Sequence, residues 1–263
     1  MTPPRRIRIV SNAFLVVAAL AFCTGANAQL ASQNTVVTTA QVRAELMAHA
    51  PDGVASGKTV WVGLELRHQP QWHTYWKNSG DSGLPTKLEW SLPPGVMAGD
   101  IAWPLPKKIA LAKLINYGYD GTVLLPVPLT ITPGFKPSLL NPDLVVKLKA
   151  SWLVCRQECI PEEGEFLLKI PVKSSTAINV AAFDAALAAQ PKALPAGKTS
   201  GATVEGQWLK LSLQGLPANL QGQTLEAFPE IAEVINPSAP WKQAWRGPPR
   251  GGVTANSRAG TGR

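Results

Sequence analysis

Residues 143–172 read DLVVKLKASWLVCRQECIPEEGEFLLKIPV and decide the fold. The first half alternates apolar and polar side chains, which is the two-residue period of a β-strand with one buried face. Its apolar positions are Leu144, Val146, Leu148, Ala150, Trp152 and Val154. The alternation resumes at Phe166, after a gap that Pro161 and Gly164 interrupt. Two strands joined by a turn are therefore expected, with Cys155 and Cys159 at the tip of the hairpin.

Short alternating runs extend outward from this hairpin toward the N-terminus. They include KTVWVGLELRH (58–68), KLEWSL (87–92) and GTVLLPVPLTIT (121–132). About six strands broken by Pro and Gly within roughly 140 residues are typical of an all-β sandwich with half-buried strands. The sequence predicts an immunoglobulin-like β-sandwich over residues 29–175.

The composition changes after the sandwich. Residues 176–200 are expected to form a short helix and a linker, because TAINVAAFDAALAAQ (176–190) is rich in Ala and ends before Pro191. Strand-like alternation returns in 201–240, which is too short for a full sandwich and predicts an incomplete second β module. Residues 241–263 combine Gly, Pro and Arg with no Asp or Glu, which is typical of a disordered basic tail.

The N-terminus has the pattern of a secretory signal. Arg5, Arg6 and Arg8 precede an apolar run over 14–22, and Ala26-Asn27-Ala28 provides a cleavage site. Residues 1–28 are therefore predicted to be a signal peptide that carries Cys23 away. No later segment is long and apolar enough to predict a membrane span.

The net charge of +8 does not indicate a nucleic-acid-binding protein. Three of these charges lie in the signal and five in the tail, so that the body between them is neutral. Hydrolytic chemistry is also without support, since there is no nucleophile elbow and no carboxylate pair beside a histidine.

The two remaining cysteines predict a disulfide in an exported protein. Residues four apart in a straight strand lie roughly 13 Å apart, whereas a disulfide needs Cα atoms within about 7 Å, so the chain must turn between them. A bridge closing so small a loop stabilises the fold by only about 2 kcal/mol. Thiol–disulfide exchange through Cys155 and Cys159 is therefore favoured over a structural brace, although a binding module with a structural disulfide stays an alternative.

Other residues leave further questions open. Arg156 favours a thiolate, while Glu158, Glu162 and Glu163 oppose it. The cysteines could also join a histidine in a copper or zinc site, so a copper-binding protein is a second alternative. The three histidines are His49, His68 and His73. The aromatic residues around Trp72 are interpreted as core packing.

Three stretches resemble the N-terminal periplasmic domain of the disulfide reductase DsbD, and more closely that of ScsB, a relative associated with copper sensitivity. They are 72–90, 116–131 and 150–172, and the most specific motif is W-L-V-C-x-x-x-C-x-P-E. The resemblance implies a periplasmic thiol:disulfide oxidoreductase without cofactor or metal. In it Cys159 forms mixed disulfides with partners and Cys155 resolves them.

The resemblance also implies partners and a cap. A thioredoxin-like domain reduces the pair, which then reduces envelope thiol proteins such as disulfide isomerases. In the family, aromatic residues of a cap loop cover the disulfide, and the equivalent region, 109–119, makes Tyr117 or Tyr119 a candidate cap, with packing at the edge of the core as the alternative.

Two departures from the family stand out. The cysteines are separated by three residues, where the better-known DsbD pattern has five. Neither a membrane domain nor a thioredoxin-like domain follows, which favours the interpretation of a truncated or frameshifted product.

Overall fold

The computed structural model describes residues 33–138, 142–193, 200–246 and 252–259. The predicted signal peptide, residues 1–28, lies outside these ranges. Most of the described chain is β-strand, with one short α-helix.

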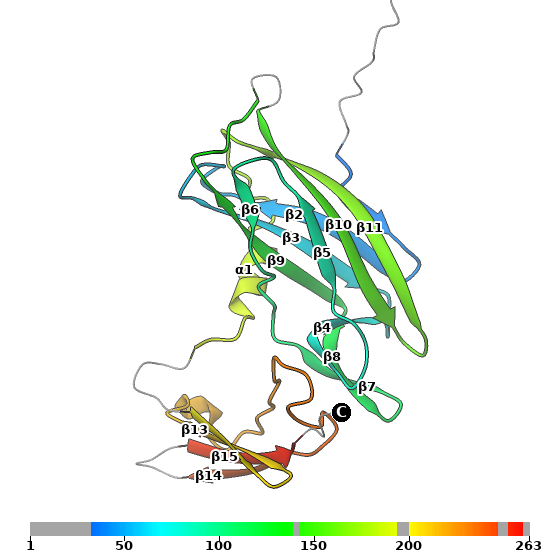
Figure 1. The fold of residues 1–263 in the computed structure, drawn as a ribbon, viewed down its shortest axis with the longest axis vertical. Helices are drawn as coiled ribbons and strands as arrows, with labels where there is room; N and C mark the ends of the chain where they lie inside the picture. Colours follow the sequence, from blue (N-terminus) through cyan, green and yellow to red (C-terminus); the bar gives the residue numbers. More distant parts are fainter. Residues whose placement is uncertain (1–32, 139–141, 194–199, 247–251, 260–263) are drawn as a thin grey trace, which may run out of the picture. The chain divides into compact units, whose positions relative to one another are not determined.

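Residues 33–171 form a sandwich of two antiparallel sheets, drawn in Figure 1 from blue to green. The first sheet has the order β1-β2-β3-β9-β6, with bounds β1 Val36–Thr38, β2 Val42–His49, β3 Thr59–His68, β9 Thr122–Ile131 and β6 Val96–Ala98. The second has the order β11-β10-β4-β8-β7, with β5 also paired to β10. Its bounds are β11 Cys159–Pro171, β10 Asp143–Cys155, β4 His73–Gly80, β8 Leu114–Asp120, β7 Lys107–Leu111 and β5 Lys87–Ser91. The predicted immunoglobulin-like sandwich is confirmed.

The core lies between the two sheets and follows the predicted alternation. In β3 the inward residues are Val60, Val62, Leu64 and Leu66, all fully buried. In β10 they are the six apolar residues that alternate in the sequence, each at most 3% exposed. Every fully buried aliphatic side chain contributes about 1.5–3 kcal/mol, so this interface is the main source of stability.

The β10–β11 hairpin is longer than the sequence indicated. Its second strand begins at Cys159, seven residues before the predicted start at Phe166. Pro161 is accommodated opposite Leu153 in the outermost strand of its sheet, where a missing N–H costs no ladder hydrogen bond. The turn is therefore only residues 156–158.

Helix α1, Val180–Ala188, falls within the predicted helical segment and lies beside β9 in Figure 1. Phe183 and Ala186 pack with Met47 and Leu124 in a small second cluster. Gly63 of β3 makes room for the helix, because a Cβ there would lie 3.2 Å from the Phe183 ring. None of the helices among the described residues is long and apolar enough to cross a membrane.

The described residues from 200 to 246 and from 252 to 258 contain a four-stranded sheet of order β12-β13-β15-β14 and one 3₁₀ turn, η1. The bounds are β12 Ser200–Glu205, β13 Trp208–Gln214, β14 Lys242–Arg246, β15 Gly252–Arg258 and η1 Ala218–Leu220. Two of these strands, β14 and β15, lie within 241–263, the range expected to be a disordered tail, of which 247–251 and 260–263 lie outside the described residues. β15 pairs with both β13 and β14, so main-chain hydrogen bonds order a segment that buries only a few side chains, such as Val253.

The segment 226–231 contacts β4 and β8 of the sandwich. The ring of Phe228 packs edge-on against Trp76 and Tyr117. The side-chain amide of Asn78 donates to the carbonyl oxygen of Pro229 over 2.7 Å. These contacts cover part of the strands that carry the site described below.

The backbones of β8 and β4 lie close together at Gly118 of β8. A Cβ added there would lie 2.1 Å from the carbonyl oxygen of Thr74. We expect Gly118→Ala to lower the free energy of unfolding by about 1–3 kcal/mol, since the backbones must separate. The matched control is Gly201→Ala in β12, where the methyl group meets nothing within 4 Å. Urea denaturation measures both, and equal loss in the two variants would contradict the close approach.

Candidate functional site

The two cysteines form a disulfide at the tip of the β10–β11 hairpin. Cys155 is the last residue of β10 and Cys159 the first of β11, and the register places them opposite each other. Their Cα atoms are 4.2 Å apart. The Arg156 N–H donates to the Glu158 carbonyl oxygen over 3.0 Å and closes the turn. The hairpin register therefore places the two cysteines directly opposite each other.

The two sulfur-bearing residues differ sharply in exposure. Cys155 is 0% exposed, whereas Cys159 belongs to the exposed residues of the turn. A thiolate from another molecule must approach the sulfur that it attacks, so the accessible end of the bond is Cys159.

The site extends as a row across four strands. Cys159 opposes Cys155, Cys155 opposes His73 of β4, and His73 opposes Asp120 of β8. Directly opposed residues in antiparallel strands project from the same face, with Cβ atoms about 4.5–5.5 Å apart. The disulfide, an imidazole and a carboxylate therefore lie side by side on one face of the sheet.

Tyr75 projects from that same face, two residues after His73. Its hydroxyl lies 3.7 Å from the Cys159 Sγ and is oriented to donate to it. Gly83 leaves space for the phenol ring, because a Cβ there would lie 2.2 Å from the ring carbon Cε1. Burial raises the pKa of the Tyr75 phenol, so the hydroxyl keeps its proton at neutral pH.

The His73 imidazole is 3% exposed and packs edge-on against Tyr75, with ring centroids 5.3 Å apart. Its Nε2 has no hydrogen-bond partner within the described part of the chain. Burial lowers the pKa of His73, and the facing carboxylate of Asp120 partly offsets this effect. The imidazole is therefore neutral at pH 7.

Two charged or titratable neighbours surround this histidine. A hydrogen bond from Lys107 lowers the pKa of Asp120, which is thus a carboxylate. His68 places Nδ1 2.8 Å from the Gly121 carbonyl oxygen and Nε2 2.9 Å from the Thr74 hydroxyl. Burial is the main reason that the pKa of His68 is lowered.

The charges flanking the cysteines have assigned partners. The Arg156 guanidinium lies over the Trp72 ring, 5.2 Å from its centroid. Glu162 opposes Trp152, accepts a 2.8 Å hydrogen bond from its indole Nε1–H, and so belongs to the core-facing side of β11. Glu163 pairs with Lys149 over 3.4 Å. Two of the three acids expected to oppose a thiolate are thus engaged elsewhere, and Glu158 stays exposed in the turn.

Tyr117 and Tyr119, the residues expected as a cap, are both members of the core cluster. Tyr119 alternates with Asp120 along β8 and therefore points to the opposite face from the disulfide row. Its hydroxyl donates to the Pro104 carbonyl oxygen, and Tyr117 packs against Phe228. Among the described residues, the phenol that reaches the disulfide is Tyr75.

Sequence reasoning named His73 only as a possible metal ligand and did not name Tyr75 as a site residue. Both lie in the aromatic cluster that was interpreted as core packing, and that cluster is indeed buried. Their alternation with Trp72, Thr74 and Trp76 could have assigned them to one face. Only the pairing of β4 with β10, which is remote in sequence, brings that face to the cysteines.

The three histidines do not assemble around the cysteines. His49 stacks on Phe183, with centroids 5.5 Å apart, and His68 bonds to Thr74 and Gly121. Within the described ranges, no three His, Cys, Asp or Glu side chains form a group that could hold a metal ion.

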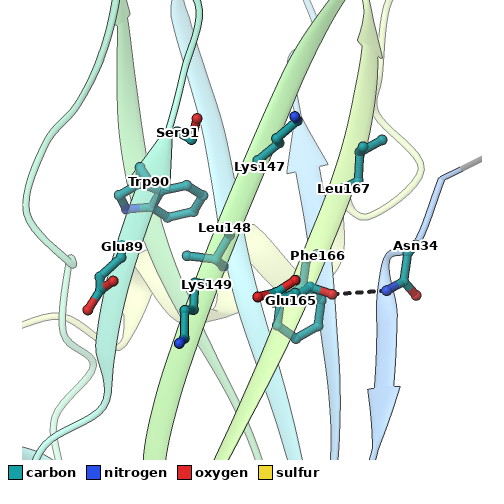
Figure 2. A pocket seen from close by; sticks show the side chains of 10 residues that line it. All are labelled: Asn34, Glu89, Trp90, Ser91, Lys147, Leu148, Lys149, Glu165, Phe166 and Leu167. Atoms are coloured by element: carbon teal, nitrogen blue, oxygen red, sulfur yellow. Dashed lines mark hydrogen bonds between the residues drawn. The ribbon is translucent and has the colours of Figure 1, made fainter. Parts of the chain in front are cut away.

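Two hollows lie on the hairpin strands. One hollow, of about 560 Å³, lies over β5, β10 and β11. Figure 2 shows Trp90, Lys147, Lys149 and Glu165 among the residues that line it. Its mixed charges and its distance along the strands from the cysteines give it no part in their chemistry. The other, of about 430 Å³, is nearer the disulfide and mainly apolar, lined by Leu84, Pro85, Lys87, Ser151, Trp152, Leu153, Pro161, Glu162 and Glu163.

Comparison with known proteins agrees with this geometry. Residues 41–171, from β2 to β11, match the family described as thiol:disulfide interchange protein DsbD, N-terminal. Among solved structures, the chain is similar to the N-terminal periplasmic domain of ScsB from Proteus mirabilis, with a TM-score of 0.57 and 17% identity. That match covers 86% of this chain and 85% of the other. A comparison with curated proteins finds no match.

The sandwich and its cysteine pair define a thiol–disulfide exchange domain of immunoglobulin-like fold. Through residues 41–171 the chain belongs to the family of DsbD N-terminal domains, and its fold resembles that of the ScsB domain. The family resemblance inferred from the sequence is confirmed.

The Tyr75 hydroxyl predicts a measurable effect on Cys159. We expect Tyr75→Phe to slow the reaction of reduced Cys159 with iodoacetamide at pH 7 by about three- to tenfold, because the reacting thiolate loses a hydrogen bond. The measurement uses the full chain with Cys23→Ala, so that Cys155 and Cys159 are its two thiols.

Tyr119→Phe is the matched control, since its hydroxyl bonds within the core. A larger effect in the Tyr119 variant than in the Tyr75 variant would contradict this prediction and would support the candidate cap from the sequence.

Proposed function

We propose that this protein is a periplasmic reductant relay that transfers electrons through Cys155 and Cys159 to thioredoxin-like envelope proteins. The observation that carries the proposal is the unequal exposure of the pair, with Cys159 at the surface and Cys155 fully buried. A brace requires no such difference, whereas exchange requires one sulfur to be reached and the other to be held back.

The unequal exposure of the two cysteines supports one order of events. In the reduced protein, the Cys159 thiolate attacks a sulfur of the partner's disulfide, and one partner thiolate leaves. Cys155 then attacks Cys159 Sγ in the mixed disulfide, the Cys155–Cys159 bond forms, and the second partner thiolate leaves. The partner gains two electrons and the pair is oxidised. A thioredoxin-like reductant reverses this sequence by attacking the exposed Cys159.

The surface beside the pair supports a protein as the partner. The apolar hollow begins two residues from each cysteine, at Leu153 and Pro161, and Leu84 on its rim is 61% exposed. Apolar surface next to a reactive sulfur allows a partner to bury area around its own cysteine. A protein that binds beside Cys159 thereby gains affinity that a small thiol lacks.

The periplasm suits this chemistry. The related ScsB domain is described as periplasmic, and the predicted signal peptide leads to the same compartment. Oxidising compartments maintain disulfides, so a reductant relay has substrates there.

The reduction potential of the pair tests the proposal directly. Equilibration of the Cys23→Ala chain with glutathione buffers, followed by thiol counting, should give a value between roughly −180 and −270 mV, the range of exchange proteins. A value below about −300 mV is typical of structural disulfides and would reassign the protein as a binding module.

Trapping distinguishes the roles of the two cysteines. Cys155→Ser, mixed with an oxidised thioredoxin-like disulfide isomerase, should accumulate a stable mixed disulfide because the resolving sulfur is missing. Cys159→Ser should accumulate about tenfold less, since the buried Cys155 is a poor nucleophile toward another protein. Non-reducing electrophoresis quantifies both species, and equal accumulation would contradict the assignment.

A further inference from the structure

The buried cysteine faces a chemical difficulty that the exposed one does not. A thiol must lose its proton before it attacks, and for Cys159 bulk water can accept that proton. Cys155 is 0% exposed, and burial in apolar surroundings stabilises the protonated thiol. Resolution of a mixed disulfide therefore requires a proton acceptor close to Cys155.

His73 is the titratable residue directly opposite Cys155, and both project from the same face of the sheet. Its Nε2 is buried and lacks a hydrogen-bond partner among the described residues. Buried polar atoms are nearly always paired, and an unpaired one beside a reactive group calls for an explanation. The explanation is that its hydrogen-bond donor is the Cys155 S–H, which exists only in the reduced protein.

We propose that His73 is the general base that accepts the proton of Cys155 during resolution of the mixed disulfide. This inference rests on the proposed exchange function and assigns a residue to its second step. His73 is opposed on its other side by Asp120, so that a thiol, an imidazole and a carboxylate stand in sequence across β10, β4 and β8. The carboxylate stabilises the imidazolium while the proton is held there.

The step balances as follows. The Cys155 S–H bond breaks and its proton moves to the imidazole, which leaves a thiolate. The thiolate forms a bond to Cys159 Sγ, and the bond between Cys159 and the partner's sulfur breaks with its electron pair on the partner. The imidazolium returns its proton as that thiolate is protonated. Two thiols have been oxidised and one partner disulfide has been reduced.

The surroundings of His73 fit this role from each packed element. Asp120 of β8 is held ionised by Lys107, and Tyr75 of β4, the strand that carries His73, keeps its proton. His68 at the end of β3 is electrostatically coupled to His73, and both are neutral at pH 7 because burial lowers their pKa. The exposed Arg156 is directed to the Trp72 ring. A neutral imidazole with a carboxylate behind it is thus available to accept a proton.

The test follows the two thiols separately in the full chain with Cys23→Ala. Reduced protein is mixed with 5,5′-dithiobis(2-nitrobenzoic acid), which releases one thionitrobenzoate when Cys159 reacts and a second when Cys155 resolves the adduct. We expect His73→Gln to change the rate of the first phase by less than about twofold. The same variant should slow the second phase about 10- to 100-fold at pH 7. The second phase should also require a higher pH.

His49→Gln is the matched control, because His49 also has a buried, unpaired ring nitrogen but stacks on Phe183. It should change neither phase. An unchanged second phase with an unchanged pH profile in His73→Gln would overturn the role of His73. Failure of the proposed exchange function gives a different result, because the parent chain itself would then show no second phase.

A measurement on the unsubstituted histidine covers the case in which His73→Gln fails to fold. The His73 imidazole is titrated by NMR in the oxidised and the reduced protein. Reduction should lower its pKa, since the Cys155 S–H then donates to the imidazole and stabilises its neutral form. Equal titration in both redox states would contradict the proposal, while His49 should be unaffected.

Discussion

The pairing register of β10 is the constraint on which both the core and the site depend. Side chains alternate with period two, so a shift of one residue would exchange the faces of the whole strand. With the observed register, Trp152 and Val154 enter the core, and Cys155 joins the outer face between Cys159 and His73. The energy that fixes the register comes from the buried aliphatic residues. The chemistry of the cysteines is thus positioned by packing that takes no part in it.

The two sulfurs differ in burial and therefore in their proposed roles. Cys159 gains access and a hydroxyl donor from Tyr75, and Cys155 gains protection from competing thiols. Protection has a cost, because an apolar surrounding suppresses the thiolate that resolution needs. A histidine on the neighbouring strand removes that conflict without opening the site to water. The exposed and buried positions therefore depend on different neighbours, although only three residues separate them in sequence.

The sequence alone predicted what local periodicity encodes. The alternation in 143–155 assigned the buried face of β10 correctly, and the cysteine spacing required a turn at the hairpin tip. It could not show that β4 pairs with β10 at Cys155, because that contact joins residues far apart in the chain. Pro161 and Gly164 were interpreted as turn residues because the local sequence does not show where β11 lies in the sheet or what packs against it. Their tolerance in β11 follows from its outer position and from the close Phe166 ring, whose nearest atoms lie 2.9 Å from a Cβ placed at Gly164.

The unpaired buried polar atoms of the described chain are concentrated on the strands that carry the site. His73 and Trp76 on β4, and Asn116 and Tyr117 on β8, each leave one such atom without a partner. Each typically costs about 1–3 kcal/mol, and the apolar core between the sheets offsets this destabilisation. A sheet selected only for stability would place apolar or fully bonded groups there. The cost of an unpaired Nε2 on His73 is consistent with a group whose partner forms only after the disulfide is reduced.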